Sequence, residues 1–512
     1  MIKKMNKGLW VLHGVMAFFL TVFVYYLLTT DIFIANSTQN LWRVATAAIN
    51  PRLDLRILQN ILNGYQNTFM FSVVGLCAGV FIGLLLSYFS LRFRRFRIGK
   101  VIAMIFRSTH EVVFMYILVL IFGLNPYIAV FAIGISFGGI MGKIFTDNMN
   151  LADDKVFLSY RGRGYSYRDN VFFNLFPNSF NSNLNYVVYR FECAIRSSIV
   201  LSYIGLPGIG FYINNAMNDA DYNSLFTYLY SLILFVLLFS FLSSLLLKKI
   251  QYKTGVFLKC FFPLAFLLCA IFTVGHIQDF LDLFQPMNLN GLVRSGNAIL
   301  NILNPFNNGF YNMQNMLRFM TYTWQTVVLG ILATVFLLIL FILLILHYFY
   351  GFVKGSRIHL KINDAVSIIN RSIPEVVFLV ILLFVMRPNV ITGALALALH
   401  NFGILVKLIK DRIESNYSKL FTAYKNRGYK SSAIFCFIFL PALGRDLFSL
   451  VSYRFEMMIK SSAVIGILGS GGLGLLLRLE MSRFNYEAIY FIVIIYIVLF
   501  LILDKANSII SR

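Results

Sequence analysis

Ionisable residues stand inside hydrophobic segments of this 512-residue chain, and the pattern occurs once in each half. An intramembrane charge is costly unless it is paired or faces water. Arg107 and Glu111, like Glu192 and Arg196, are four residues apart, which predicts that each pair shares one face of a helix. The full set is Arg107, Glu111, Arg190, Glu192 and Arg196, followed by Arg371, Glu375, Arg454, Glu456 and Lys460 in the second half.

Two interpretations of these charges stay open. They could form a salt-bridge cluster that locks the third and fifth spans of each copy and transmits movement from the long cytoplasmic loop between them. They could instead line an electropositive pathway for an anionic substrate, because intramembrane ionisable groups often mark such routes. Loss of charge would damage transport in both cases, but only the pathway predicts an altered substrate preference.

A glycine cluster at 469–474 has the spacing G-x-G-x-x-G of dinucleotide-binding proteins. That site requires a preceding β-strand, whereas an apolar helix is predicted here, and the matching cluster at 205–210 lacks the spacing. We therefore expect close helix packing or a flexible helix end at these glycines. They are Gly205, Gly208, Gly210, Gly469, Gly472 and Gly474.

No motif for catalysis or for cofactor binding occurs in the sequence. Without a G-x-x-x-x-G-K-[ST] loop, ATP would have to be bound by another polypeptide. An H-E-x-x-H motif is missing, and the five cysteines lack the spacing of metal ligands. We expect neither catalytic residues, nor a metal, nor another cofactor in this chain.

Composition and charge indicate a membrane protein. The chain is 59% hydrophobic and only 13% charged, which is too few charges to cover a soluble surface. A net charge of +23 would suggest nucleic-acid binding in a soluble protein. In a membrane protein, Lys and Arg gather on cytoplasmic loops, so the partner is expected to be the lipid bilayer and not nucleic acid.

Twelve apolar segments are long enough to cross a bilayer. Basic clusters fall on alternate loops, which predicts that both termini lie in the cytoplasm. The segments lie near 9–29, 68–91, 101–123, 127–146, 186–206 and 225–247, and near 257–276, 325–350, 365–386, 390–410, 450–469 and 486–503.

The chain contains an internal repeat. The sequence YRFE occurs at 189–192 and again at 453–456, which is 264 positions later, and this register needs no gap from 107 to 210. Outside this window the spacing between equivalent residues is no longer 264, and Thr68 pairs best with Thr326. Six spans per copy predict a parallel repeat with a pseudo-two-fold axis along the membrane normal. The predicted units are 1–254, with a core at 68–247, and 255–512, with a core at 325–503.

Two long cytoplasmic loops, 147–185 and 411–449, share the pattern F-x-x-Y-(R/K)-x-R-G-Y followed by thirteen residues from Gly to Pro. A short helix, a glycine break and a proline-marked second turn are expected there. A plain basic loop held by anionic lipid would not need this fixed spacing. The residues are Tyr160, Arg163, Gly164, Tyr165 and Pro177, and Tyr424, Arg427, Gly428, Tyr429 and Pro441.

This pattern resembles the coupling loop of ABC importer permeases. The segments RSIPEVVF (371–378) and YRFEMMIKSSAVIGILGSGGLG (453–474) are similar to permeases of the phosphonate type (PhnE-like), and the resemblance covers 68–247 and 325–503. The usual Glu of that loop is Leu158 in the first copy and Thr422 in the second. The resemblance implies an all-α integral membrane protein of two fused MetI-like permease units.

The resemblance also implies a function: passage of phosphonate or a related phosphorus oxyanion through a bacterial plasma (inner) membrane. Two cytoplasmic ATPase subunits would bind ATP and dock on the loops. A substrate-binding protein would dock on the outer segments 30–66 and 277–324, which could equally be structural caps. A twelve-span secondary transporter driven by an ion gradient, a membrane enzyme, and an ABC permease for another substrate such as a phosphorylated vitamin are the alternatives.

Overall fold

The computed structural model describes residues 2–34, 37–92, 98–150, 166–252, 254–283, 286–304, 310–354, 357–412, 423–434, 437 and 440–510. Within these ranges the regular secondary structure is helical, apart from one isolated β-bridge between Phe33 and Met386. The predicted all-α class is confirmed.

The helices group into two compact units. The first, here called the α15 unit, comprises Met1–Ala45, Asn308–Ser482 and Val498–Arg512, and the second, the α3 unit, comprises Thr46–Asn307 and Arg483–Ile497. These groupings cross the predicted boundary between 254 and 255. That boundary describes the sequence repeat and stays a prediction.

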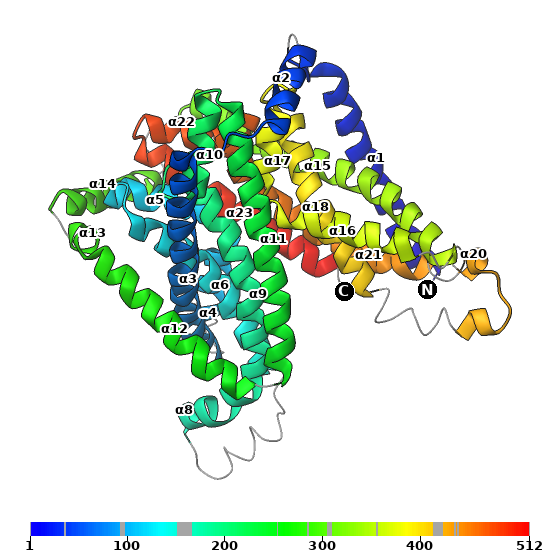
Figure 1. Ribbon diagram of the computed structural model, residues 1–512, viewed down its shortest axis with the longest axis horizontal. Coiled ribbons are helices and arrows are strands. Elements are labelled where there is room, and N and C mark those ends of the chain that lie inside the picture. Colours follow the sequence, from blue (N-terminus) through cyan, green and yellow to red (C-terminus); the bar gives the residue numbers. More distant parts are fainter. Residues whose placement is uncertain are drawn as a thin grey trace. The chain divides into compact units, whose positions relative to one another are not determined.

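The α3 unit contains most helices of the first copy (Figure 1). These first-copy helices are α3 (Leu55–Arg92), α4 (Ile98–Ser108), α5 (Glu111–Phe122), α6 (Pro126–Asn150), α8 (Tyr167–Asn170), η1 (Val171–Leu175), α9 (Phe176–Tyr203), α10 (Ile209–Asn218) and α11 (Tyr222–Tyr252). The unit also contains α12 (Thr254–Gly275), α13 (Ile277–Asp282) and α14 (Pro286–Leu303), which come from the second predicted repeat. Helix α2 (Ser37–Ile49) and helix α23 (Tyr486–Ile510) each run from one unit into the other.

The α15 unit contains the corresponding helices of the second copy, and its core forms where α15, α18 and α21 pack around Leu332, Leu397 and Met458. Its helices are α1 (Ile2–Thr29), α15 (Met313–Lys354), α16 (Arg357–Ser372), α17 (Glu375–Leu382), α18 (Val390–Arg412), α20 (Ser431–Ile434), α21 (Leu440–Ile465), η4 (Gly466–Ser470) and α22 (Gly472–Ser482).

The first helix of each predicted repeat joins the other repeat's unit. Helix α1 packs along α15, and α12 packs along α3. On α12, Phe272 lies 6.1 Å from the ring of Phe71 of α3, centroid to centroid. The predicted repeats therefore exchange their first helices when the two units form.

Helices α3 and α6 meet along glycines spaced four residues apart. A Cβ atom on Gly83 would lie 2.7 Å from the Cβ of Met141, and one on Gly138 would lie 2.7 Å from the Cβ of Ile82. Small residues at this spacing allow membrane helices to approach closely and gain dispersion contacts. The two rows are Gly75, Gly79 and Gly83 on α3, and Gly134, Gly138 and Gly142 on α6.

By length and composition, six described helices could each cross a membrane, and the number rises to nine if each of three bent helix pairs is one span. Most of the twelve predicted spans are thus matched by helices of sufficient length and hydropathy. Helix α9 does not meet these criteria, and the apolar parts of α1 and α12 are shorter, at Gly14–Thr29 and Pro263–Gly275. The bent pairs are α4 with α5, α16 with α17, and Leu447–Ser470 with Gly472–Ser482.

The spans predicted near 101–123 and 365–386 are wrong as single helices, because each is broken by a sharp bend of 93° and 90° respectively. In the second copy Pro374 lacks an N–H group and disfavours helix in the residue before it. In the first copy His110 has extended backbone angles, and its Nδ1 accepts a hydrogen bond from the N–H of Val112 at 3.4 Å. Two different residues therefore end a helix at the same place.

Candidate functional site

The bend separates two residues that the sequence predicted to share one helix face. Arg107 lies in the last turn of α4 and Glu111 is the first residue of α5, so the i,i+4 prediction for this pair is wrong. Arg371 and Glu375 are divided in the same way between α16 and α17. The physical reason is the bend itself, since the i,i+4 relation places side chains together only on a continuous helix.

Each carboxylate begins a short helix after the bend. Glu111 is 7% exposed and Glu375 is 8% exposed. The N-terminus of a helix carries partial positive charge and unpaired N–H groups, which favour a carboxylate at this position. The bend thus places a buried acid in the same electrostatic setting in both copies.

Polar side chains of neighbouring helices approach these acids. Ser197 of α9 donates its hydroxyl to Glu111 Oε1 at 2.5 Å. The Nδ1 atom of His110 lies 3.4 Å from Glu111 Oε2 and also 3.4 Å from the backbone nitrogen of Val112. In the second copy, His400 Nε2 lies 3.8 Å from Glu375 Oε2.

A side chain from the following helix holds the carbonyl group at each bend. Ser136 of α6 donates to the carbonyl of Thr109 at 3.3 Å, and His400 of α18 donates from Nδ1 to the carbonyl of Ile373 at 2.7 Å. The 264-residue register relates both donors and both acceptors. Sequence similarity does not reveal this pair, because serine and histidine differ in size and chemistry although the register aligns them.

In α9 the prediction for Glu192 and Arg196 is confirmed, because Arg196 Nη2 lies 4.0 Å from Glu192 Oε1. Arg190 donates from Nε to the hydroxyl of Tyr186 at 2.8 Å, and its guanidinium lies 5.2 Å from that ring centroid. A further cation–π contact places it 5.6 Å from the ring of Phe137 in α6.

The second copy keeps the contact between the arginine and the preceding tyrosine, which in the first copy places Arg190 6.0 Å from the ring centroid of Tyr189. The guanidinium of Arg454 lies 5.2 Å from the ring centroid of Tyr453. Glu456 is 2% exposed, and Lys460 is half-buried. A pair that the sequence analysis did not name, Arg318 Nη2 and Glu480 Oε1, lies 2.6 Å apart and joins α15 to α22.

The glycine clusters lie where the chain turns sharply after α9 and after α21. Gly205 and Gly469, which are equivalent in the register, have φ of +134° and +105°, and such values favour glycine. Cβ atoms on Gly210 and Gly474 would lie 2.3 Å from the carbonyl oxygens of Ile199 and Ala463. A helix precedes both clusters, so the dinucleotide site has no structural basis there.

Thr68 and Thr326 fix these glycine turns in the same way. Thr68 Oγ1 accepts the backbone N–H of Ile209 at 3.1 Å, and Thr326 Oγ1 accepts that of Leu473 at 2.8 Å. Ser198 of α9 also donates to the carbonyl of Thr68 at 3.0 Å. The threonines paired by sequence thus occupy equivalent positions in the two units.

In the second of the two loops that the sequence predicts to be cytoplasmic, a helical turn over 423–426 ends at Gly428, whose φ is +87°. The N–H of Tyr429 donates to the carbonyl oxygen of Tyr424 at 3.3 Å, and the N–H of Gly428 donates to the carbonyl oxygen of Lys425 at 3.0 Å. These two hydrogen bonds form a Schellman motif. The rings of Tyr424 and Tyr429 lie 5.8 Å apart, and the Arg427 guanidinium lies 5.8 Å from the Tyr424 ring. The Arg-Gly-Tyr pattern therefore builds one local cap.

In the first loop, Tyr160, Arg163, Gly164 and Tyr165 lie outside the described residues. Pro177 is the second residue of α9 and Pro441 is the second residue of α21. A proline suits the first turn of a helix, where its missing N–H would have no intrahelical partner, but in the first copy α9 continues the helical run of α8 and η1 without a break. Each loop therefore leads directly into the helix that carries the YRFE charges.

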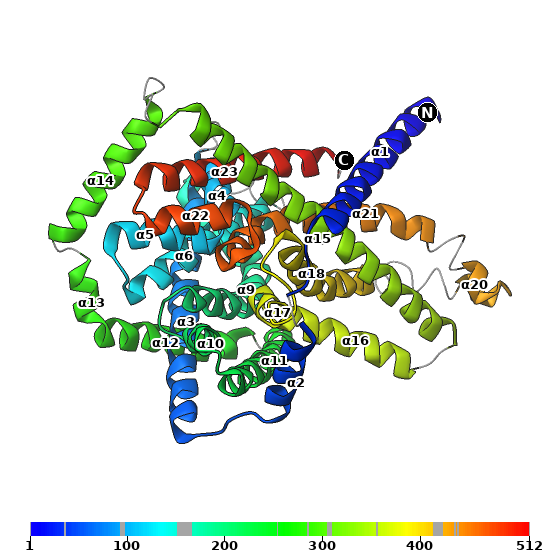
Figure 2. The same cartoon turned by 90° about the horizontal axis from the view of Figure 1, so that it is seen from above.

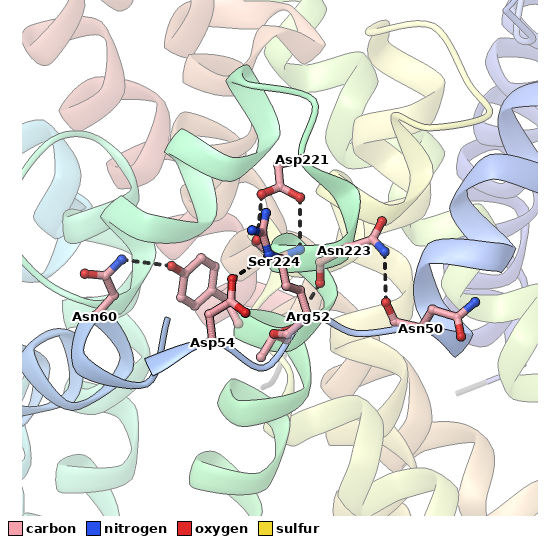
Figure 3. A network of polar contacts seen from close by, with 9 residues as sticks. Asn50, Arg52, Asp54, Asn60, Asp221, Asn223 and Ser224 are labelled. Atoms are coloured by element: carbon pink, nitrogen blue, oxygen red, sulfur yellow. Dashed lines mark hydrogen bonds and ion pairs between the residues drawn. The ribbon is translucent and has the colours of Figure 1, made fainter. Parts of the chain in front are cut away.

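The outer segment before α3 is tied to the start of α11 by a polar network (Figure 3). Asn223 donates to the carbonyl of Asn50 at 2.9 Å, and Arg52 Nε lies 2.6 Å from Asp54 Oδ2. Asn60 donates to the hydroxyl of Tyr228 at 3.1 Å. Contacts to backbone carbonyl groups favour the structural-cap interpretation for this segment.

Apolar helices in two units, glycine-packed helices and a loop motif that occurs twice in the sequence are features of the membrane component of a transporter. The chain belongs to the family of binding-protein-dependent transport system inner membrane components, whose model matches residues 75–255 and 353–512. This membership makes the chain a multi-pass inner-membrane permease with tandem MetI-like units, and it implies an ATPase and a substrate-binding protein as partners.

Known relatives are similar over long stretches. A protein named phosphate-import permease protein PhnE, from Mycolicibacterium smegmatis, is 23% identical over 78% of this chain and 75% of its own length. A putative phosphite transport system permease protein, HtxC of Stutzerimonas stutzeri, is 25% identical over 40% of this chain and 73% of its own. A putative cryptic phosphonate permease, PhnE2 of Escherichia coli, is 28% identical over 22% of this chain and 90% of its own. No solved structure matches the chain.

Proposed function

We propose that this chain supplies both permease halves of an ABC importer for phosphonate or a related phosphorus oxyanion. The observation that carries the proposal is the similarity to a phosphate-import permease across 410 residues, together with relatives named for phosphite and phosphonate transport. The two family matches in one chain support the fused arrangement.

The loops around Gly164 and Gly428 each receive one cytoplasmic ATPase subunit, so two subunits serve one chain. These subunits bind ATP, and this chain binds no cofactor and catalyses no reaction. The exposed Schellman cap of Tyr424, Arg427, Gly428 and Tyr429 supports a docking role, because it presents a rigid aromatic and cationic surface. The usual Glu is replaced by Thr422 in this loop, so the cap carries the contact.

Movement of a loop reaches the membrane through α9 and α21. In the first copy the chain is continuously helical from Tyr167 to Tyr203, and Ser197 on this run bonds Glu111 at the start of α5. Displacement of the loop by ATPase closure therefore pulls on the bent span. This geometry supports the interpretation of the charges as a coupling network.

The alternating basic loops support a cytoplasmic location for both termini. The substrate-binding protein docks on the opposite side and selects the ligand, while the permease units provide the pathway. A binding protein that prefers a phosphorylated vitamin would give the same permease a different substrate.

Reconstitution tests the proposal. The chain is placed in vesicles with its ATPase and its binding protein, and uptake of radiolabelled phosphonate, phosphite and phosphate is measured with and without ATP. We expect uptake only when ATP, ATPase and binding protein are all present. Uptake driven by a proton or sodium gradient without the ATPase would contradict an importer and favour a secondary transporter. Ligand binding by the isolated binding protein identifies the substrate.

A further inference from the structure

Helix α14 has one face packed against protein. Its buried residues recur at helical spacing, and three of them, Ser295, Ala298 and Ile302, are 4%, 4% and 6% exposed. A Cβ atom on Gly291, on the same face, would lie 2.4 Å from the carbonyl oxygen of Ile121, near the end of α5. The helix therefore rests directly on the end of a bent span.

A second face of α14 is polar and exposed. Asn290, Arg294, Asn297 and Asn301 form it, and they fall within one arc because a helix turns about 100° per residue. Asn301 donates to Glu487 Oε1 of α23 at 2.6 Å. This face carries groups that water or headgroups can solvate.

A third face of α14 is aliphatic and also exposed. Leu292, Val293, Ile299, Leu300 and Leu303 are 44%, 61%, 42%, 66% and 70% exposed. They fill the arc between the buried face and the polar face. An exposed aliphatic face of this extent indicates an apolar partner outside the described chain.

The aliphatic face continues an apolar surface that begins on α12. Phe266 and Val274 of α12 are 77% and 73% exposed, and Ile277 and Leu281 of α13 are 59% and 56% exposed. Figure 2 shows α12, α13 and α14 following one another along one edge of the α3 unit. Helix α12 has an apolar stretch at Pro263–Gly275, and the outward side of such a helix in a permease faces acyl chains.

We propose that α14 lies in the membrane interface, with its aliphatic face on lipid acyl chains and its polar face toward water. Helices of this type combine a clear apolar face with a polar face and lie in the plane of the interface. A docked protein is a poorer fit, because the cores of protein interfaces are enriched in aromatic residues and Arg, and the aliphatic face has neither. The helix would thereby fix the end of α5 relative to the bilayer.

Depth-dependent quenching tests this proposal. Single cysteines are placed by Leu300→Cys and Val293→Cys on the aliphatic face and by Asn297→Cys on the polar face, in a chain whose five native cysteines are changed to Ala. Each is labelled with NBD and reconstituted in vesicles of phosphatidylethanolamine and phosphatidylglycerol that contain a doxyl lipid. We expect several-fold stronger lipid quenching at 293 and 300 than at 297, and the reverse order with aqueous iodide.

Equal quenching at all three positions would overturn the proposal. A second result would also overturn the proposal: labels at 293 and 300 are not quenched by the doxyl lipid and are protected from iodide only when a substrate-binding protein is added. That result would assign the aliphatic face to a protein partner. If the cysteine-free chain does not fold, the natural chain can carry Leu300→Trp or Asn297→Trp instead. Quenching of tryptophan fluorescence by brominated lipid, corrected for the three native tryptophans, then compares the aliphatic face with the polar face.

Discussion

At the scale of single residues, the two copies use different side chains for equivalent tasks. A histidine and a proline end the helix before Glu111 and Glu375, and a serine and a histidine hold the carbonyl group at the bend. Because both copies are part of one chain, the residue at a position in the first copy can differ from the equivalent residue in the second copy. A variant can therefore be compared with its counterpart 264 positions away in the same molecule.

Ser197→Ala removes the hydroxyl that donates to Glu111 and leaves a buried carboxylate short of a partner. A hydrogen bond to a charged group contributes about 1.5–3 kcal/mol, so we expect a lower midpoint of thermal unfolding in detergent and slower ATP-driven uptake. Ser461→Ala is the matched control, because Ser461 is the counterpart of Ser197 in the register and its hydroxyl makes no hydrogen bond within the described part of the chain. Equal effects of the two variants would contradict a role for the Ser197–Glu111 contact.

Gly428→Ala forces an L-residue into a φ of +87°, where a side chain costs about 1–2 kcal/mol. We expect weaker capture of the ATPase in a pull-down and reduced ATP-driven uptake, with unchanged thermal unfolding of the membrane helices. Gly444→Ala in α21 is the control, because its Cβ would meet nothing within 4 Å and its φ is not positive. Normal ATPase capture by the Gly428 variant would argue against docking at this cap.

At the scale of helices, close approach sets the geometry of the α3 unit. The glycine rows of α3 and α6 leave no room for side chains, whereas the second copy has Ala333 and Ala398 in the corresponding rows. The two units thus reach similar helix pairs with different contact residues. Stability at these contacts depends on shape and not on polar bonds.

Gly83→Leu tests this packing, because even a Cβ atom there would lie 2.7 Å from the Cβ of Met141. Overpacking costs about 1–3 kcal/mol, so we expect a lower thermal midpoint and loss of purified protein, measured by size-exclusion chromatography. Gly296→Leu on the exposed surface of α14 should leave both unchanged, since nothing lies within 4 Å of its Cβ. An unaffected Gly83 variant would show that α3 and α6 are further apart.

At the scale of the whole molecule, the exchange of first helices ties each unit to both repeats. Helix α12 follows α11 in sequence but packs along α3, and the thiol of Cys269 in α12 lies near that of Cys77 in α3. A cut between α11 and α12 would therefore leave two fragments that still share one packed unit.

Oxidative crosslinking checks this arrangement. With a protease site inserted between α11 and α12, copper-phenanthroline should join Cys77 to Cys269, so that the two fragments migrate together on a gel until they are reduced. The crosslink should disappear in Cys269→Ser and persist in Cys193→Ser, whose thiol lies on α9. Separate fragments after oxidation would mean that α12 does not pack on α3.

The sequence by itself determined the features that depend on composition and on neighbours along the chain. Hydrophobic segments identified most of the spans, since burial in lipid depends on length and polarity. The 264-residue register located equivalent residues such as Thr68 and Thr326 through similarity alone. Gly428 and Pro441 mark a helix end and a helix start by local backbone chemistry, so their positions followed from spacing.

Only the tertiary structure decided where a long apolar stretch bends and which helices meet. Arg107 and Glu111 looked like one helical pair because the break at Thr109 and His110 contains no proline, and the carbonyl group at the bend is contacted by Ser136 of another helix. The packing of α12 on α3 likewise depends on side chains far apart in sequence. Such contacts are fixed by shape in three dimensions, and no local pattern in the chain encodes them.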